Sequence, residues 1–286
     1  MKKILITGAN SYIGTSFERW ISQYSEDYFV ETVNTRNNLW AEKDFSSYDV
    51  VFHVAGIAHV SADSKMETSY YRVNKELTIK VAKKAKVEGV KQFIFMSSII
   101  VYGDSCNSKK VIDISTVPSP NNFYGSSKLQ AEEGIKSLED NKFKIVILRP
   151  PMIYGKGSKG NYPKLAKIAC KLPIFPDINN ERSMLHIDNL CEFIRLIIDN
   201  EERGLFFPQN SEYVKTSEMV KLIAEVHGKK IRLVKVFNGI IKMMSNKSIL
   251  INKVFGNLVY DHSMSKYKVN YQVRDMKDSI EATEVE

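Results

Sequence analysis

In the first half of the chain, short and nearly continuous apolar runs alternate with longer stretches of helical spacing. The apolar runs are rich in β-branched residues and cover residues 3–7, 29–34, 49–56 and 92–98. The intervening stretches, such as residues 15–24 and 66–88, repeat apolar side chains at the period of an α-helix. Apolar strands that alternate with helices are typical of a parallel sheet covered on both faces. The pattern therefore predicts an α/β fold, a Rossmann-type doubly wound parallel sheet.

The alternation becomes irregular after Tyr154, which indicates a smaller C-terminal lobe. We expect a dinucleotide-binding Rossmann domain over residues 1–155 and a mainly substrate-binding lobe over residues 156–286. Some helices or strands after residue 156 are expected to pack as part of the first domain. The pattern also predicts a strand at residues 184–187 and a short helix with an acidic tail over residues 275–286.

The composition is that of an ordinary soluble globular protein, with 43% hydrophobic and 26% charged residues. No apolar run approaches the roughly 20 residues that cross a bilayer. The three cysteines, Cys106, Cys170 and Cys191, are odd in number and widely scattered. This distribution argues against a disulfide framework or a zinc site, and it favours a reducing cytoplasm. The net charge of +8 suits a phosphate-bearing substrate, a nucleic acid or an anionic membrane, and it equally suits a lysine-rich solvated surface.

A glycine turn lies between the first predicted strand and the first predicted helix. Gly8 and Gly14 occupy the outer positions of the turn, and Ser11 stands where a third glycine is usual. This arrangement sets a helix N-terminus against a pyrophosphate, so the turn predicts dinucleotide binding. The Ser11 hydroxyl either reduces the backbone's approach to the phosphates or donates a hydrogen bond to them.

The end of the second predicted strand indicates which dinucleotide is bound. An acidic residue there would accept from a ribose 2′-hydroxyl and favour NAD, but the chain has Asn34, Thr35 and Arg36. An arginine suits the 2′-phosphate of NADP. We therefore expect NADP(H) to be favoured, with NAD(H) as the alternative.

Tyr124 and Lys128 are the candidate reactive pair. At the start of a helix their i and i+4 spacing places phenol and ammonium on one face. The cation is expected to lower the pKa of the phenol from about 10 towards neutrality. Ser98 ends a predicted strand at the carboxyl edge of the sheet, where ligands bind in such folds. His53 is expected to be a packed strand residue, and His59 is given no role.

Five stretches together resemble the NAD-dependent epimerase/dehydratase family of extended short-chain dehydrogenases/reductases. They are residues 7–14, 93–103, 124–128, 148–155 and 182–190. The resemblance implies that Ser98, Tyr124 and Lys128 are catalytic and that Ser98, Asn161 and Arg182 bind the substrate, with Arg182 on a nucleotide-sugar diphosphate. The candidate cofactor-binding residues are Gly8, Ser11, Tyr12, Ile13, Gly14, Asn34, Arg36, Asp44, Ala55, Gly56, Asn74, Tyr124, Lys128 and Pro151.

Departures from the family pattern narrow the expected reaction. Residues 99–102 provide no acid or base after Ser98, which argues against dehydration. Met152 stands where 4-epimerases often carry a nucleotide-binding asparagine, and Asn161 is the candidate to replace it. The chain is most similar to bacterial capsule-pathway enzymes that reduce UDP-4-keto-6-deoxy-N-acetylhexosamines. The alternatives are a UDP-hexose or UDP-N-acetylhexosamine 4-epimerase and a non-catalytic NAD(P)-sensing regulator.

Residues 226–260 contain no Asp or Glu but seven Lys and Arg among apolar residues. This segment is interpreted as a lid or core helix pair with lysines facing water, and peripheral membrane association is the alternative. No nucleic-acid module is recognised. A UDP-linked sugar is therefore the expected partner, and a homodimer is possible by analogy with the family.

Overall fold

The computed structural model describes residues 1–58, 64–104, 111–245 and 249–285. His59, Cys106 and Lys247 lie outside these ranges. The chain divides into two compact units. The first unit contains residues 1–103, 117–150 and 190–208, and the second contains residues 104–116, 151–189 and 209–286. The predicted boundary after residue 155 came with the expectation that some elements of the lobe return to the first domain. In the structure, residues 190–208 belong to the first unit and residues 104–116 to the second.

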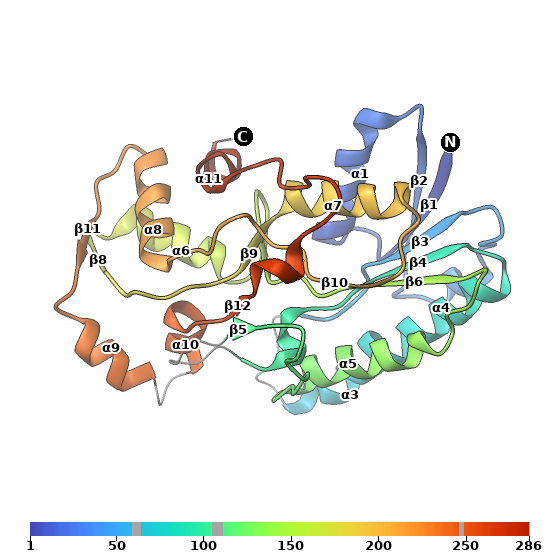
Figure 1. Ribbon diagram of the computed structural model, residues 1–286, viewed down its shortest axis with the longest axis horizontal. Helices are drawn as coiled ribbons and strands as arrows, with labels where there is room; N and C mark the ends of the chain where they lie inside the picture. The colour runs from blue at the N-terminus through green and yellow to red at the C-terminus, as the bar shows by residue number, and fades with distance from the viewer. Residues whose placement is uncertain (59–63, 105–110, 246–248, 286) are drawn as a thin grey trace. The chain divides into compact units, whose positions relative to one another are not determined.

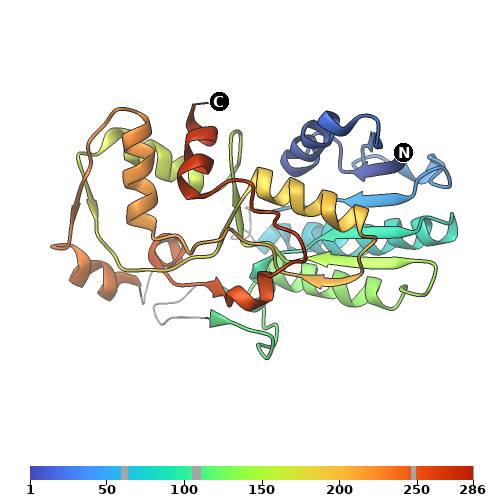
Figure 2. The same cartoon turned by 45° about the horizontal axis from the view of Figure 1, so that its top comes forward.

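The first unit is built on a six-stranded parallel sheet with the strand order β10-β6-β4-β3-β1-β2. In sequence order the strands are β1 (Lys2–Thr7), β2 (Tyr28–Val33), β3 (Val50–His53), β4 (Gln92–Met96), β6 (Lys144–Leu148) and β10 (Gly204–Phe206). Helices α4 (Thr78–Val87) and α5 (Phe123–Lys136) cover one face, and α1 (Tyr12–Ile21) and α7 (Ile187–Asp199) cover the other (Figures 1 and 2). The predicted doubly wound parallel sheet is confirmed.

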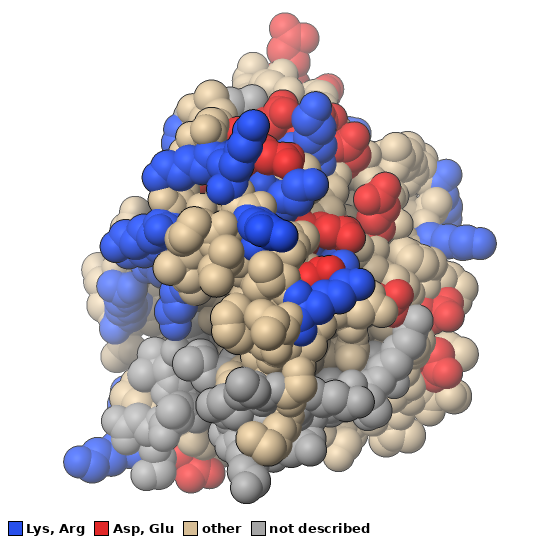
Figure 3. Space-filling view, turned by 90° about the vertical axis from the view of Figure 1, so that its left-hand side faces the viewer, with Lys and Arg blue, Asp and Glu red and all other residues tan. Residues whose placement is uncertain are grey.

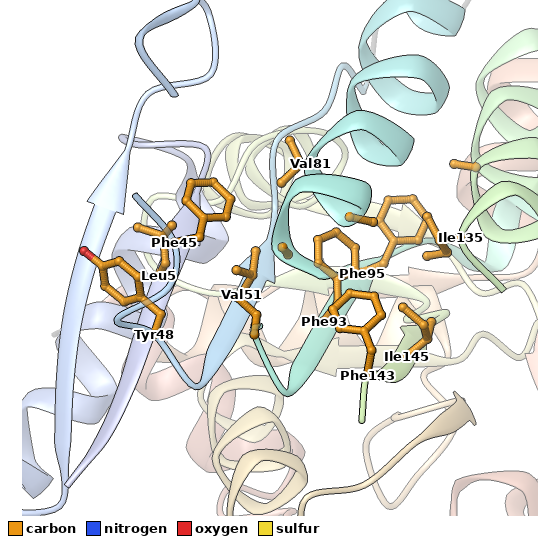
Figure 4. Close-up of a cluster of buried hydrophobic side chains, with 14 of the residues drawn as sticks. Leu5, Phe45, Tyr48, Val51, Val81, Phe93, Phe95, Ile135, Phe143 and Ile145 are labelled. Carbon is orange, nitrogen blue, oxygen red and sulfur yellow. The ribbon is translucent and has the colours of Figure 1, made fainter. Parts of the chain in front are cut away.

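Burial on both faces explains the apolar runs. Ile4, Leu5 and Ile6 on β1 are all fully buried, although successive side chains of a strand point to opposite faces. One face packs Leu5, Val51, Phe93 and Phe95 with helix residues such as Val81 and Ile135, as Figure 4 shows. A strand covered on both sides has no need of alternating polar residues, so its sequence is continuously apolar.

The helical stretch predicted over residues 66–88 is regular only in part. It runs through a 3-10 turn (Ser64–Met66), α3 (Glu67–Tyr70), a π-helical segment (Tyr71–Leu77) and α4. A π-helical segment shifts the side chains that follow it around the helix axis and often lies at a functional site. Shorter elements of this unit are η1 (Ser22–Tyr24), α2 (Leu39–Glu42) and η4 (Ile99–Tyr102).

The last strand of the sheet comes from a distant part of the sequence. β10 pairs in parallel with β6, with Phe206 opposite Leu148. The Gln92 amide donates to the carbonyl oxygens of Ile197 (3.1 Å) and Glu202 (2.9 Å) and so ties β4 to the end of α7. These contacts make residues 190–208 part of the first unit.

Within its described residues, the second unit contains three short pairs of parallel strands. They are β7 (Met152–Tyr154) with β9 (Met184–His186), β8 (Ile174–Pro176) with β11 (Arg232–Val234), and β5 (Val111–Ile112) with β12 (Val259–Tyr260). Its helices are α6 (Tyr162–Lys171), α8 (Thr216–Val226), α9 (Asn238–Ser245), α10 (Ile249–Phe255), η5 (His262–Ser265) and α11 (Met276–Glu284). A core of Leu165, Phe175, Met219, Ile223 and Ile280 joins α6, β8, α8 and α11. The strand predicted at residues 184–187 and the helix within residues 275–286 are confirmed. Across the described residues, no helix has the length and apolar character that a membrane span requires.

A buried ion pair joins α5 to the end of β6. The Arg149 guanidinium contacts the Glu132 carboxylate with an Nη2–Oε2 distance of 2.6 Å, and the two side chains are only 4% and 0% exposed. The Ser97 hydroxyl also donates to Glu132, and Arg149 donates to the Tyr102 hydroxyl at 2.6 Å. Each charge in this cluster depends on its partner, because an isolated buried charge is very unfavourable.

We therefore predict that Glu132→Gln lowers the free energy of unfolding by about 3 kcal/mol, since Arg149 would lose its anionic partner in a dry environment. Urea denaturation of the purified variant measures the change. Glu133→Gln is the matched control, because this neighbouring glutamate is exposed. Equal stability of the two variants would contradict the prediction.

Candidate functional site

The start of α5 positions Tyr124. Asn122 caps the helix, and its side-chain oxygen accepts a hydrogen bond from the Gly125 backbone N–H at 2.9 Å. A Cβ atom at Gly125 would come within 2.8 Å of the Ile100 carbonyl oxygen. Glycine at position 125 thus lets the first turn of α5 approach the segment that follows Ser98.

Ser98 and Tyr124 meet at this point. Ser98 caps η4, and its hydroxyl accepts from the Ile100 N–H at 3.3 Å. The Ser98 hydroxyl is near enough to lower the pKa of the Tyr124 phenol, but burial dominates and raises the pKa of Tyr124 to about 12. The Tyr70 ring, 5.8 Å from the Tyr124 ring between centroids, lies beside it. The expected lowering of this pKa is therefore wrong for the structure described.

Lys128 lies one helical turn after Tyr124 and is buried. Its ammonium donates to the Met96 carbonyl oxygen at 2.7 Å and lies 4.7 Å from the centroid of the Phe95 ring. Burial lowers the pKa of Lys128 to about 8, and the negative charge of Glu132 opposes this shift. Lys128 therefore loses its positive charge as the pH rises through about 8.

Asn74 and Gly56 lie close to the Lys128 ammonium. A Cβ atom at Gly56 would lie 3.2 Å from Lys128 Nζ and 3.1 Å from Asn74 Oδ1. Asn74 accepts from the Ile57 N–H at 2.8 Å and donates to the Ile57 carbonyl and to the Ser127 hydroxyl. The π-helical segment thus directs Asn74 against the loop after β3. The assignment of Asn74 to cofactor binding stays a prediction.

The predicted dinucleotide turn joins β1 to α1. Gly8 has φ +116°, and a Cβ atom there would lie 2.8 Å from the Ala55 backbone nitrogen. The Ser11 hydroxyl accepts from the Gly14 N–H at 3.2 Å and so caps α1. In the structure, the Ser11 side chain is therefore used to cap the N-terminus of α1. The half-buried Tyr12 and Ile13 are the first residues of α1.

This turn fits a dinucleotide. Gly8, which has no side chain, and the capping residue Ser11 lie just before a ten-residue helix, and that helix has no acidic residue in its first turn. Backbone N–H groups and the positive end of the helix dipole favour a phosphate at such a position. The residues present would thus hold the pyrophosphate of NAD(P) without a repelling carboxylate in that first turn.

The candidates at the end of β2 are exposed. The Asn34 side chain accepts from the Arg36 N–H at 2.9 Å and forms a local turn that displays the arginine. Asp44 is exposed as well. Its carboxylate accepts from the Ser46 N–H at 2.8 Å, and this bond lowers the pKa of Asp44.

Asn161, Arg182 and Pro151 belong to the second unit. Asn161 is half-buried at the start of α6, and Pro151 is buried just before β7. Arg182 donates to the Gly256 carbonyl oxygen at 3.0 Å, and burial lowers its pKa to about 10. Among the described residues, no carboxylate lies within ion-pair distance of Arg182.

The sequence interpretation missed the groups that surround the reactive pair. Glu132 had a signal, because it follows Lys128 by four residues on the same helix. Tyr70 and the Met96 carbonyl had no signal, since only the folded chain brings them to α5. His53 is a packed residue, as expected. Its two ring nitrogens contact the Thr7 and Thr78 hydroxyls at 2.7 and 3.0 Å, and burial lowers its pKa to about 3.

Comparison with known proteins identifies the family. Residues 4–206 match the NAD dependent epimerase/dehydratase family. The chain is 31% identical over 298 residues to a UDP-glucose 4-epimerase of Vibrio cholerae, which covers 95% of this chain and 90% of that protein. It is 29% identical over 242 residues to the N-acetyl-alpha-D-glucosaminyl-diphospho-ditrans,octacis-undecaprenol 4-epimerase of Escherichia coli O157:H7, which covers 78% and 71%.

Among solved structures, RMD from Pseudomonas aeruginosa complexed with NADPH is similar with a TM-score of 0.76 at 18% identity, and the similarity covers 99% of this chain and 98% of that one. At this identity the likeness shows the shared fold. The family match over 203 residues and the Vibrio cholerae relative show, beyond the shared fold, the family to which the chain belongs. The chain belongs to the NAD dependent epimerase/dehydratase family, as an enzyme of the extended short-chain dehydrogenase/reductase type.

Proposed function

We propose that the protein reduces the 4-keto group of a UDP-4-keto-6-deoxy-N-acetylhexosamine with NADPH. One observation carries the proposal. The Ser98 hydroxyl is near enough to the Tyr124 phenol to lower its pKa, and Tyr124 lies one helical turn before the buried Lys128 ammonium. Two hydroxyl donors that meet at one point suit a carbonyl oxygen that gains negative charge during the reaction.

In the proposed reaction Ser98, Tyr124 and Lys128 have different roles. When bound, the nicotinamide supplies a hydride to C4 of the sugar. Ser98 holds the C4 oxygen and fixes its position. Tyr124 passes its phenolic proton to that oxygen. Lys128, while it is protonated, stabilises the negative charge that Tyr124 acquires.

The protonation state of Tyr124 favours reduction. With a pKa of about 12, the phenol carries its proton at neutral pH. A protonated acid is the form required to protonate a keto oxygen, whereas oxidation of a sugar hydroxyl requires a base. Arg36 supports the same direction, because a guanidinium in place of a carboxylate suits the 2′-phosphate of NADPH.

The second candidate is a 4-epimerase that retains NAD and transfers hydride twice at C4. The two relatives that are 4-epimerases favour it. In either reaction we assign the sugar diphosphate to Arg182. A half-buried guanidinium without a carboxylate partner among the described residues is suited to a diphosphate. Asn161 is assigned to the nucleotide.

The test supplies purified protein with an enzymatically made UDP-4-keto-6-deoxy-N-acetylhexosamine and either NADPH or NADH. We expect one NADPH to be oxidised for each sugar reduced. Tyr124→Phe should lower kcat by about 10²-fold or more. Tyr24→Phe, a tyrosine of η1, is the control that should keep full activity. Redox-neutral conversion of a UDP-hexose with tightly retained NAD would instead establish the epimerase.

Cofactor choice gives a separate prediction. Arg36→Ala should raise the Kd for NADPH by about tenfold or more, because a charged hydrogen bond to the 2′-phosphate is lost. The Kd for NADH should stay nearly unchanged. Fluorescence titration of the reduced nicotinamide measures both. Arg19→Ala, an exposed arginine on α1, is the control. A parallel loss of affinity for both cofactors would refute a role for Arg36 in recognising the 2′-phosphate.

The pH dependence tests Lys128. We expect kcat/KM for reduction to fall as the pH rises through about 8, because Lys128 loses its proton there. Glu132 raises the pKa of Lys128, so Glu132→Gln should move this alkaline limb to lower pH. Glu133→Gln should leave it in place. A limb that does not move in the folded Glu132→Gln variant would show that Glu132 is only a structural partner of Arg149.

A further inference from the structure

The positive charge of the chain is concentrated in two spans of the second unit. Residues 155–176 contain five Lys and residues 226–260 contain seven Lys and Arg, and neither span contains Asp or Glu. They hold 12 of the 41 basic residues and none of the 33 acidic residues, so the rest of the chain has a net charge of −4. The overall charge of +8 therefore originates in these spans.

The fold joins the two spans side by side. β8 and β11 pair in parallel, with Arg232 opposite Ile174. The Arg232 N–H donates to the Pro173 carbonyl oxygen at 2.9 Å, and the Lys229 ammonium donates to the Cys170 carbonyl oxygen. In Figure 1, β8 and β11 lie at the left-hand end with α9 below them. Spans about 60 residues apart in sequence thus form one surface.

Apolar side chains are exposed between these cations. Val236 is 77% exposed, Leu172 48%, Ile174 42% and Phe237 40%. Lys171, Lys230 and Lys235 beside them are exposed as well. We call the exposed residues of 171–174 and 229–237 the basic–apolar face. Figure 3 views this end of the unit and shows Lys and Arg side chains spread over its left part, with uncharged surface between them.

Acidic side chains near this end belong to other elements. Glu225 on α8 pairs with Lys221, and Glu281 on α11 pairs with Lys277. Asp177, directly after β8, pairs with Lys215 at 2.9 Å. These carboxylates form their ion pairs with lysines outside the basic–apolar face. Asp177 also attracts Lys235 electrostatically, so it offsets part of the charge of this one lysine.

We propose that the basic–apolar face binds the surface of an anionic lipid bilayer. Each Lys or Arg is attracted by the negative potential of acidic headgroups. Burial of apolar surface at the boundary between headgroups and acyl chains lowers the free energy. The side chains that can be buried there are Leu172, Ile174, Val236 and Phe237. A nucleic acid would satisfy the cations but would leave the aliphatic side chains in water. The bilayer satisfies both kinds of residue.

Cosedimentation of the whole protein with vesicles tests the proposal. Vesicles of phosphatidylglycerol and phosphatidylcholine are compared with pure phosphatidylcholine, at low salt and at about 0.5 M salt, which screens exposed charges. We expect binding only to the anionic vesicles and weakening at high salt. The readout is independent of the proposed reaction.

Two variants and a matched control locate the surface. Lys230→Glu with Lys235→Glu should raise the lipid concentration for half-maximal binding by about tenfold or more. Val236→Ser with Phe237→Ser should raise it several-fold. Lys80→Glu with Lys83→Glu makes the same charge change on exposed residues of α4 and should bind vesicles within about twofold of wild type. Unchanged melting temperatures show that each variant is folded.

Three results would overturn the proposal. They are absence of binding to anionic vesicles at low salt, an equal loss of binding in the α4 control, and unaltered binding in Val236→Ser with Phe237→Ser. If that last variant binds vesicles like wild type and duplex DNA displaces the vesicles fully, the face is a nucleic-acid surface.

Discussion

The candidate site depends on the burial of one positive charge. Lys128 is only 5% exposed, and its environment consists of a carbonyl oxygen, an aromatic ring and the carboxylate of Glu132. A buried ammonium is stable only when such groups replace its hydration. Glu132 in turn is held by Arg149 at the end of β6. The charge of the reactive pair is thereby linked to the packing of α5 on the sheet.

The features that depend on burial or on local residue spacing could be predicted from the sequence. The fully buried strands produce continuous apolar runs, and the glycine turn and the Tyr124–Lys128 spacing are local features. The π-helical segment before Asn74 and the contact of Tyr70 with Tyr124 depend on tertiary packing, so no local pattern marked them. The pKa of Tyr124 was expected in the wrong direction, because spacing reveals the nearby cation but not the degree of burial.

The division into two units shows a similar limit. The first unit takes its last strand, Gly204–Phe206, from a region where the alternation of strands and helices is no longer regular. Three residues are too few to show a period. The pairing of Phe206 with Leu148 and the amide of Gln92 define the place of this strand, and both are contacts over long sequence distances.

The two reactive groups also differ in how they respond to pH. Tyr124 titrates at about 12 and Lys128 at about 8, so below pH 8 both carry their protons and the pair has one positive charge. In the proposed reduction, transfer of the phenolic proton to a keto oxygen would then leave a phenolate one helical turn from an ammonium, whose positive charge offsets the negative charge. Above pH 8 the same transfer would leave an isolated anion, whose burial is costly. If Tyr124 is the acid of the proposed reduction, we therefore expect the low pKa of Lys128 to set the upper pH at which it acts.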